Sequence, residues 1–418
     1  MHLWKRWKYA IPTGVVAAGA MACAVYFFNP FANTAHARLE LGVPTNPDAV
    51  DPPALHELDL TKLTIEPERV TAPAAGDRTA VLSLDPSLQR TAQRLFVHRG
   101  VTEGSILLMD LRSARMLVYA SINEGARRDI NVEATAPAAS VFKVVTATAL
   151  VAQGISPDHK ECYRGGHSGF EMSDLIPNER RDKWCATLGN AVGRSLNVVM
   201  GRLAMNTLTP ETLGNAAKLY GFGTPMAFDV PVQPSTVNLS EENQLEFART
   251  AAGFWNTTLS PMHALLIPAT IANKGVTPRP VIVSSVTNKK GKPIYRAPAA
   301  KQERGRVMTP ELAEAVAKMM EETFTNGTAH ADFYNRKGQS YLPSIRLAGK
   351  TGSLTNSKQR YFTWLVGYAG TDQPEVAYAV LVNNGPKWKT KAPLLTREIL
   401  RAYYAAVGAE GVTAPSTR

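Results

Sequence analysis

The spacing of apolar residues predicts strands and helices in a definite order along the chain. Two apolar runs, 105–109 and 116–120, are separated by a short turn and predict an antiparallel hairpin. Further candidate strands follow near the end of the chain, with Gly370 among the turn residues that separate them. We expect these strands to join the hairpin in one sheet. The later strands span 345–354, 362–368 and 376–382.

Helical patterns flank these strands in the sequence. Asp85 can cap a helix that Pro86 opens and that ends near Gly100. After the last strand, apolar residues recur at helical spacing over 394–403. A mostly helical region is expected between the hairpin and the later strands, over about 136–272. The predicted fold class is therefore α/β of the α+β kind: an antiparallel sheet flanked by N- and C-terminal helices, with an inserted, mostly helical subdomain.

The first residues predict the compartment. Lys5, Arg6 and Lys8 precede an uncharged, mostly apolar run over 10–28, which as a helix would span roughly 30 Å, the thickness of a bilayer core. Because positive charge stays on the cytoplasmic side, the rest of the chain is expected outside the cytoplasm. Small residues on both sides of His36 resemble a cleavage site, so a removed signal peptide stays open beside the favoured uncleaved anchor.

Composition divides the chain into four parts. Residues 1–37 hold the basic tip and the anchor or signal segment, and 38–78 are rich in proline, as in an extended extracytoplasmic spacer. A short folded segment around 55–65 is the alternative within that spacer. One domain is expected over 79–408, and 409–418 would be a flexible tail.

Charge and composition narrow the class of protein. With 44% hydrophobic and 19% charged residues among 418, the chain can bury a large core and is globular. Lys and Arg outnumber Asp and Glu by 46 to 35, which suits work beside an anionic surface or polymer. The basic residues are scattered and form no zinc-finger, RNA-recognition or basic-zipper pattern. Nucleic acid is therefore not an expected partner.

Two cysteines, Cys162 and Cys185, lie in the part expected to be exported. In an oxidising compartment they predict a disulfide, worth about 3 kcal/mol in the chain-entropy model. His159 and His167 flank Cys162, so a zinc site is the alternative, but the spacing fits no standard zinc module. No metal and no cofactor is expected, since Walker and dinucleotide motifs are missing as well.

Candidate chemistry begins at Ser140, which opens a predicted helix and has Lys143 three residues on. Positions i and i+3 share a helix face, so the lysine amine would reach the serine hydroxyl. A lysine buried beside another cation has a lowered pKa and becomes a general base. The helix start also offers Ser140 free backbone N–H groups for a developing oxyanion.

Two further segments add polar groups. Ser195 can relay a proton, and Asn197 can both donate to and accept from a peptide-like substrate. Lys350, Thr351 and Ser353 surround Gly352 on a predicted strand. The glycine permits close approach of another backbone, as docking an extended peptide at a strand edge requires; Ser353 and its neighbours would hold a carboxylate.

Together the Ser-x-x-Lys, Ser-x-Asn and Lys-Thr-Gly segments, in this order, resemble the transpeptidase domain of penicillin-binding proteins. The resemblance covers about 79–408 and includes supporting segments at 83–89, 220–223 and 259–265. It implies a β-lactamase/transpeptidase-like fold.

The resemblance also implies roles. Ser140 would attack the penultimate D-alanine carbonyl of a peptidoglycan stem peptide, and Lys143 would take its proton. Ser195 and Lys350 would pass a proton to the leaving D-alanine. The oxyanion hole would be the backbone N–H groups of Ser140 and Ser353. Substrate-binding residues implied in the same way are Asn197, Thr351, Gly352 and Ser353.

The implied activity is a peptidoglycan D,D-transpeptidase that β-lactam antibiotics inhibit covalently at Ser140. It would work from the bacterial cytoplasmic membrane as a single-pass protein with a periplasmic catalytic domain. Since no glycosyltransferase domain is recognisable, a partner would polymerise glycan. A D,D-carboxypeptidase and a non-catalytic β-lactam-binding sensor or scaffold remain alternatives. A class A β-lactamase is disfavoured because no Glu-x-x-Leu-Asn segment follows Ser195 at a suitable distance.

Two features depart from the family pattern. Gly253, Phe254 and Trp255 stand where the family often has Gly-x-Gly, and the bulky rings would narrow a cleft. The polar insertion 159–184, which contains Cys162, is interpreted as a lid or a partner surface.

Overall fold

The computed structural model describes residues 53–125, 127–166, 169–356, 359–385 and 389–415. No helix within these ranges is long and apolar enough to cross a bilayer. The apolar run expected to form an anchor precedes the described part of the chain, as does the rest of the expected N-terminal segment.

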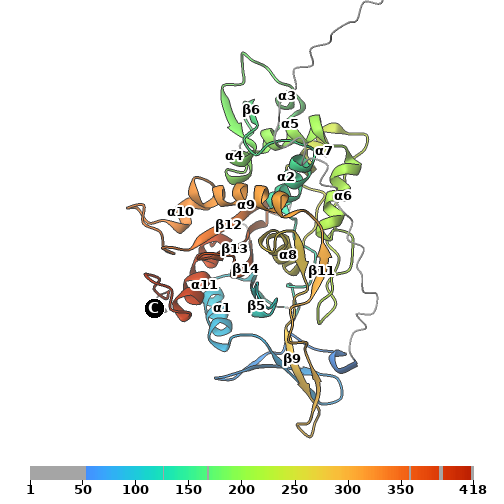
Figure 1. The fold of residues 1–418 in the computed structure, drawn as a ribbon, viewed down its shortest axis with the longest axis vertical. Helices are drawn as coiled ribbons and strands as arrows, with labels where there is room; N and C mark the ends of the chain where they lie inside the picture. The colour runs from blue at the N-terminus through green and yellow to red at the C-terminus, as the bar shows by residue number, and fades with distance from the viewer. Residues whose placement is uncertain (1–52, 126, 167–168, 357–358, 386–388, 416–418) are drawn as a thin grey trace, which may run out of the picture.

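A five-stranded antiparallel sheet forms the centre of the molecule (Figure 1). The last strands of the chain pair with the first hairpin, so the predicted single sheet and the predicted fold class are confirmed. In spatial order the strands are β12 (Arg346–Thr355), β13 (Tyr361–Gly370), β14 (Val376–Asn384), β4 (Glu103–Asp110) and β5 (Met116–Asn123). The inner strands β13 and β14 are buried at all but one residue, because helices cover both faces of the sheet.

Alternate residues of β14 serve two different cores. Val380 packs among the residues of the N- and C-terminal helices, whereas Leu381 belongs to a larger core shared with the inserted helices. The alternation follows from the two-residue period of a strand. One face therefore carries α1 (Pro86–His98) and α11 (Ala392–Ala406), the other carries α8 (Pro261–Ala272), and α9 (Pro310–Thr325) packs along β12.

The first helix starts as the sequence predicts. Asp85 accepts a hydrogen bond from the Leu88 backbone N–H, and Pro86 occupies the first turn. The end of α11 differs from the expected flexible tail 409–418. Over the described part of that tail, Arg401 donates to the Thr413 side chain and the Ala414 carbonyl, so the segment is tied to the helix.

The inserted subdomain between β5 and α8 is mostly helical and lies at the upper end of the molecule in Figure 1. Local signals set its helices: Thr209 caps one of them, Pro210 opens it, and Gly221 ends it in the left-handed region at φ 103°. Its elements are η2 (Ala139–Phe142), α2 (Lys143–Ala152), α4 (Leu188–Gly193), α5 (Asn197–Thr207), α6 (Pro210–Tyr220) and α7 (Gln244–Ala251).

The structure differs from the expected spacer over 38–78. From Thr64 onward this segment forms strands of a second sheet, in which Val70, Thr71 and Ala72 are all buried. Pro73 is tolerated there since the first strand pairs only with the two residues at the start of the second. The sheet contains β1 (Thr64–Ile65), β2 (Val70–Ala74), β3 (Arg78–Leu82), β9 (Val283–Thr287) and β10 (Pro293–Arg296).

The remaining short elements connect these parts. A two-stranded sheet precedes α9, and a single helical turn follows it. These elements are β8 (Val276–Pro278), β11 (Glu303–Arg306), α10 (His330–Phe333) and, before the first strand, η1 (Pro53–Leu55).

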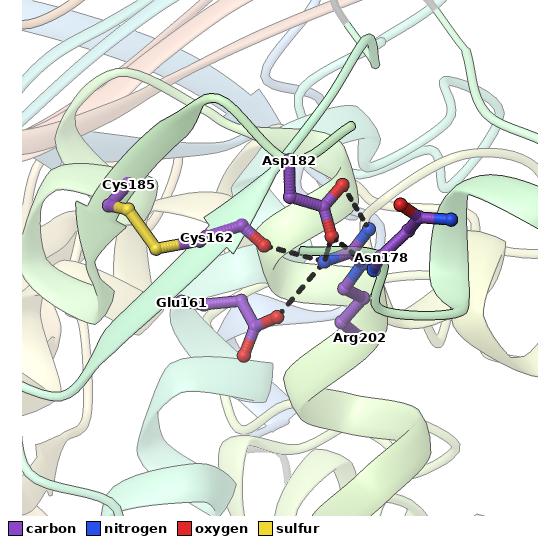
Figure 2. Close-up of a disulfide and its surroundings, with 6 residues drawn as sticks. All are labelled: Glu161, Cys162, Asn178, Asp182, Cys185 and Arg202. Carbon is purple, nitrogen blue, oxygen red and sulfur yellow. Dashed lines mark hydrogen bonds and ion pairs between the residues drawn. A yellow bond between two sulfur atoms is a disulfide. The ribbon is translucent and has the colours of Figure 1, made fainter. Parts of the chain in front are cut away.

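The insertion 159–184 and the residues just after it form a compact unit closed by a disulfide between Cys162 and Cys185 (Figure 2). The two cysteines stand opposite each other on neighbouring antiparallel strands. The structure thus makes the pairing that the sequence favours over a zinc site. The unit contains β6 (Lys160–Tyr163), α3 (Met172–Leu175) and β7 (Trp184–Thr187).

Arg202 of α5 ties this unit to the domain (Figure 2). Its fully buried guanidinium donates to both carboxylate oxygens of Asp182, at 3.0 and 3.1 Å, and to Glu161 at 3.1 Å. It also donates to the Cys162 carbonyl at 2.5 Å. These bonds hold the pKa of Asp182 well below its usual range. Because losing either partner would leave a buried charge unpaired, the insertion is fixed to α5.

Candidate active site

Ser140 lies in η2, a single 3₁₀ turn that leads directly into α2. Its predecessor Ala139 has a φ of 50°, a left-handed conformation that costs an L-residue about 1 kcal/mol or more. Two glycines pack against this turn. A Cβ on Gly253 would lie 2.3 Å from the Ala139 carbonyl oxygen, and one on Gly352 would lie 3.3 Å from the Ala139 Cβ. Close backbone contact therefore holds the serine in place.

Lys143 follows one turn later and is fully buried. Its Nζ lies 2.8 Å from the Ser140 hydroxyl and 2.7 Å from Asn197 Oδ1, and it donates to the Ala252 carbonyl. Burial, and then the positive charge of Lys350, lower the pKa of Lys143 well below its usual value. An amine that loses its proton so readily, in contact with a hydroxyl, can act as a general base.

Lys350 of β12 is the second buried amine. It donates to the Ser195 hydroxyl at 2.9 Å and to the Thr351 carbonyl at 3.0 Å. Burial lowers the pKa of Lys350 to about 7. A group that titrates near neutrality can both give and accept a proton, so Lys350 and Ser195 have the contact that a proton relay requires.

The turn between α4 and α5 brings Ser195 and Asn197 to these lysines. Ser195 has a φ of 58°, and Asn197 is the first residue of α5. The turn can sit this deep because α4 packs closely on α9: a Cβ on Gly193 would lie 2.6 Å from the Glu322 Cβ. Asn190 reinforces the contact by donating to the Glu322 carboxylate at 2.5 Å.

Strand β12 places the Lys-Thr-Gly-Ser segment at an edge of the central sheet, since β12 has a partner strand on one side only within the described residues. Thr351 is mostly buried and shares a 2.5 Å hydrogen bond with the Thr328 hydroxyl. Gly352 contacts the turn before Ser140, and the Ser353 side chain is exposed. All the sequence-predicted catalytic and binding residues thus converge on one place.

A cleft of about 720 Å³ opens at this place, lined by the serines, Asn197 and Thr351 but not by the two buried lysines. Phe254 and Trp255 form part of its wall, and Trp255 is 45% exposed. Among the described residues of its rim, Arg194 and Lys391 are basic and Asp332 is acidic, and this excess of positive charge favours an anionic ligand. Its lining includes Ser140, Ser195, Asn197, Gly253, Thr328, Thr351, Ser353, Thr363 and Trp364.

Sequence reasoning missed several residues of the site. Thr328 bonds to Thr351 across the chain, and Trp364 donates from its indole N–H to the Pro137 carbonyl at 2.9 Å, which anchors the segment before Ser140. Neither stands in a recognisable motif. Only their positions in the folded chain reveal them.

The disulfide leaves Cys162 and Cys185 without thiolates to offer a metal. Across the described ranges, no group of three or more His, Cys, Asp or Glu side chains is arranged to hold a metal ion. The site is therefore built from lysines, hydroxyls and one amide.

The family model described as penicillin binding protein transpeptidase domain matches residues 104–402. Among curated proteins, the peptidoglycan D,D-transpeptidase PbpA of Mycobacterium tuberculosis is 25% identical over 281 residues, which cover 61% of this chain and 51% of the relative. The chain therefore spans about half the length of this relative.

Solved structures resemble the fold. A D,D-transpeptidase domain of a peptidoglycan glycosyltransferase from Eggerthella lenta has a TM-score of 0.65 at 22% identity, covering 79% of this chain and 83% of the other. Penicillin-binding protein A from M. tuberculosis, as an imipenem acyl-enzyme complex, has a TM-score of 0.60 at 21% identity, covering 77% and 79%.

Proposed function

This chain belongs to the penicillin-binding protein transpeptidase family, and from that membership we propose that it cross-links peptidoglycan stem peptides through an acyl-enzyme at Ser140. The observation that carries the proposal is the 2.8 Å contact between the Ser140 hydroxyl and the buried Lys143 amine. The second amine, Lys350, lies 2.9 Å from the Ser195 hydroxyl. A nucleophile with a base and a separate proton relay is what acyl transfer needs.

In the acylation step, Ser140 Oγ bonds to the carbonyl carbon of the penultimate D-alanine while Lys143 accepts the hydroxyl proton. The peptide C–N bond then breaks, and the leaving nitrogen takes a proton from Ser195, which Lys350 replaces. The backbone N–H groups of Ser140 and Ser353 would stabilise the oxyanion. Losing one such donor typically costs about a hundred- to a thousandfold in rate.

Substrate binding would use the edge of β12. An extended peptide can lie along an exposed strand edge, with the hydroxyls of Thr351 and Ser353 toward its terminal carboxylate. Asn197 would hold the substrate amide from the opposite side of the cleft. The positive rim supports an anionic peptide.

Deacylation completes the transfer. An amine of a neighbouring peptide attacks the ester carbonyl, the ester C–O bond breaks, and Ser140 regains its proton from the incoming amine through Lys143. If water attacked instead, the protein would be a carboxypeptidase.

We propose that the catalytic domain acts on the outer side of the bacterial cytoplasmic membrane. The disulfide supports an oxidising compartment, and the basic residues before the apolar run 10–28 support a single anchor with the catalytic domain outside. A separate glycan polymerase would supply the strands to be cross-linked.

Intact mass spectrometry of the full chain in detergent, before and after incubation with benzylpenicillin, tests the proposal. We expect one persistent adduct with the mass of the penicillin, and no adduct in Ser140→Ala. The β-lactam ring opens as its carbonyl is transferred to the serine, and no acceptor amine is present to release it. Absence of the adduct would overturn the proposal; rapid hydrolysis of penicillin without an adduct would indicate a β-lactamase.

Release of D-alanine from a pentapeptide then separates the transferase from its closest alternative. A transpeptidase is expected to release D-alanine faster when an acceptor amine is added, because the amine resolves the acyl-enzyme. An equal rate with and without the amine would indicate a carboxypeptidase. No release at all, with an intact penicillin adduct, would indicate a sensor.

A further inference from the structure

One loop after α7 touches both the nucleophile and its base. The Ala252 carbonyl accepts a hydrogen bond from Lys143 Nζ. At the next residue, a Cβ on Gly253 would lie 2.9 Å from the Ser140 Cα. Any movement of this loop would therefore disturb the burial of Lys143 and the position of Ser140 together.

The outer side of the loop is held by the disulfide-closed insertion. Phe170 of the insertion packs edge to face on Phe254, with ring centroids 5.6 Å apart and planes at 89°. Such pairs are attractive beyond their buried area. Arg249, at the end of α7, donates to the Phe170 carbonyl and to the Glu171 carboxylate, each at 3.1 Å. The insertion thus contacts both the loop after α7 and the end of α7 itself.

Phe170 is itself rigidly placed. Its side chain is only 4% exposed. It lies on Gly201 of α5, where an added Cβ would come within 2.9 Å of the phenyl ring. The next residue of α5 is Arg202, which binds the carboxylates of the insertion. The ring is wedged between α5 and the loop that contacts Ser140.

We propose that Phe170 is a positioning residue of the active site: from the insertion, it holds the 252–255 loop against Ser140 and Lys143. The insertion is then a brace of the catalytic machinery rather than a separate lid or appendage. The test of this proposal measures acylation of Ser140 and therefore rests on the proposed function.

Loss of the phenyl ring would let the loop relax outward and admit water to Lys143. Among the charged groups, Lys350 on β12 is the one that lowers the pKa of Lys143, and α5 and η2 present to it the uncharged side chains of Asn197 and Ser140. Burial is the larger cause of its low pKa. With less burial the pKa of Lys143 rises, so acylation would require a higher pH.

The test measures the rate of acylation of the full chain by benzylpenicillin as a function of pH, by intact mass. For Phe170→Ala we expect the rate to fall about ten- to a hundredfold, as for a displaced catalytic group, and the acid limb of the profile to move to higher pH. Phe170→Leu keeps an apolar contact with Gly201 and Phe254, so it should recover most of the rate with a smaller shift.

Phe96→Ala is the matched control. Phe96 is equally buried, but it lies on α1 in the core on the other face of the central sheet. Its truncation should lower the melting temperature and leave the acid limb where it is in the wild type. The control therefore distinguishes a general loss of stability from the loss of the Phe170 contact.

The outcomes separate the two proposals. If the wild type forms no adduct, the proposed function fails. If the wild type is acylated and Phe170→Ala keeps the wild-type acid limb, the brace is refuted, as it is if Phe96→Ala shifts the limb equally. Should Phe170→Ala fail to fold, Phe170→Leu decides: a limb shifted upward supports the brace, and an unshifted limb overturns it.

Discussion

Two lysine side chains, Lys143 and Lys350, are fully buried, each against a serine that lines the cleft. Burying a cation is costly, and burying two together is more so, which is why their amines lose protons far more readily than a lysine in water. Each amine donates to a serine hydroxyl and to a backbone carbonyl, and Lys143 also donates to the Asn197 amide oxygen. The low pKa values of the two amines thus originate in desolvation, and no carboxylate in the described part of the chain pairs with either amine.

Replacing Lys350 by Met should move the acid limb of Ser140 acylation to higher pH. The charge of Lys350 is one cause of the lowered pKa of Lys143, so its removal raises that pKa, and the base stays protonated up to a higher pH. Acylation by benzylpenicillin at a series of pH values measures the shift. Lys391→Met removes another cleft-lining charge and should leave the limb in place. An unchanged or lowered limb in Lys350→Met would count against this coupling.

At the level of elements, the site depends on close approach of backbones from distant segments. The loop after α7, the turn η2 and strand β12 meet at two glycines, Gly253 and Gly352. Side chains at either position would separate the elements and spread the catalytic residues apart. The two glycines therefore allow the close packing that keeps the residues of the site in position.

Gly253→Ala should abolish most acylation, by about a hundredfold or more, since its methyl group would collide with the Ala139 carbonyl and the Ser140 Cα. Gly291→Ala is its match: the φ angles are 78° and 76°, but no described residue lies within 4 Å of a Cβ at Gly291. In both variants an alanine must adopt a left-handed backbone conformation, which lowers the free energy of unfolding by about 1 kcal/mol. Rates of penicillin acylation and melting temperatures compare them; equal losses of acylation would disprove the role of the contact.

The sequence predicted the elements with strong local signals. Asp85 and Pro86 mark the start of α1, and the apolar runs mark the strands of the central sheet. It also identified every residue of the three motifs that the cleft brings together. It did not predict the strands within 64–82, because proline and alanine there suggested a spacer and the partner strand β9 lies some two hundred residues away in the chain.

Contacts without a motif were likewise invisible. Phe170 and Phe254 are in contact only because the insertion folds back on α5. Neither sequence segment contains a pattern that predicts this contact. The role of Trp364 depends on strand register in the same way. Pairings of this kind are decided by tertiary packing, which a single sequence does not display.

For the molecule as a whole, the buried amines link stability to pH. The unfolded chain keeps the proton of Lys350 up to about pH 10.5, whereas the folded protein loses it near 7. Between these values the unfolded state binds more protons, so the free energy of unfolding rises with pH, by up to about 1.4 kcal/mol per pH unit for this group. Below about pH 7 both states carry the proton, so the folded protein bears the full free-energy cost of burying the charged Lys350 amine.

Lys350→Met should therefore flatten that dependence. Denaturant unfolding at several pH values between about 7.5 and 9.5 should give a slope smaller than that of the wild type by up to about 1.4 kcal/mol per pH unit. Lys318→Met, which removes an exposed charge from α9, should leave the slope unchanged, because folding does not desolvate it. A slope in Lys350→Met equal to the wild-type slope would contradict the buried-amine account.

The pairing of β4 with β14 has a consequence for biosynthesis. The ribosome makes Ser140 and Lys143 soon after β4, but β12, which carries Lys350, and β14, which closes the sheet, come near the end of the chain. Pairing between such distant segments is slow to form and requires both to be present. A chain still being translated thus has its serine but not yet the complete site. Under the proposed function, reactivity toward peptides and sensitivity to an antibiotic would begin only when the last strands have emerged.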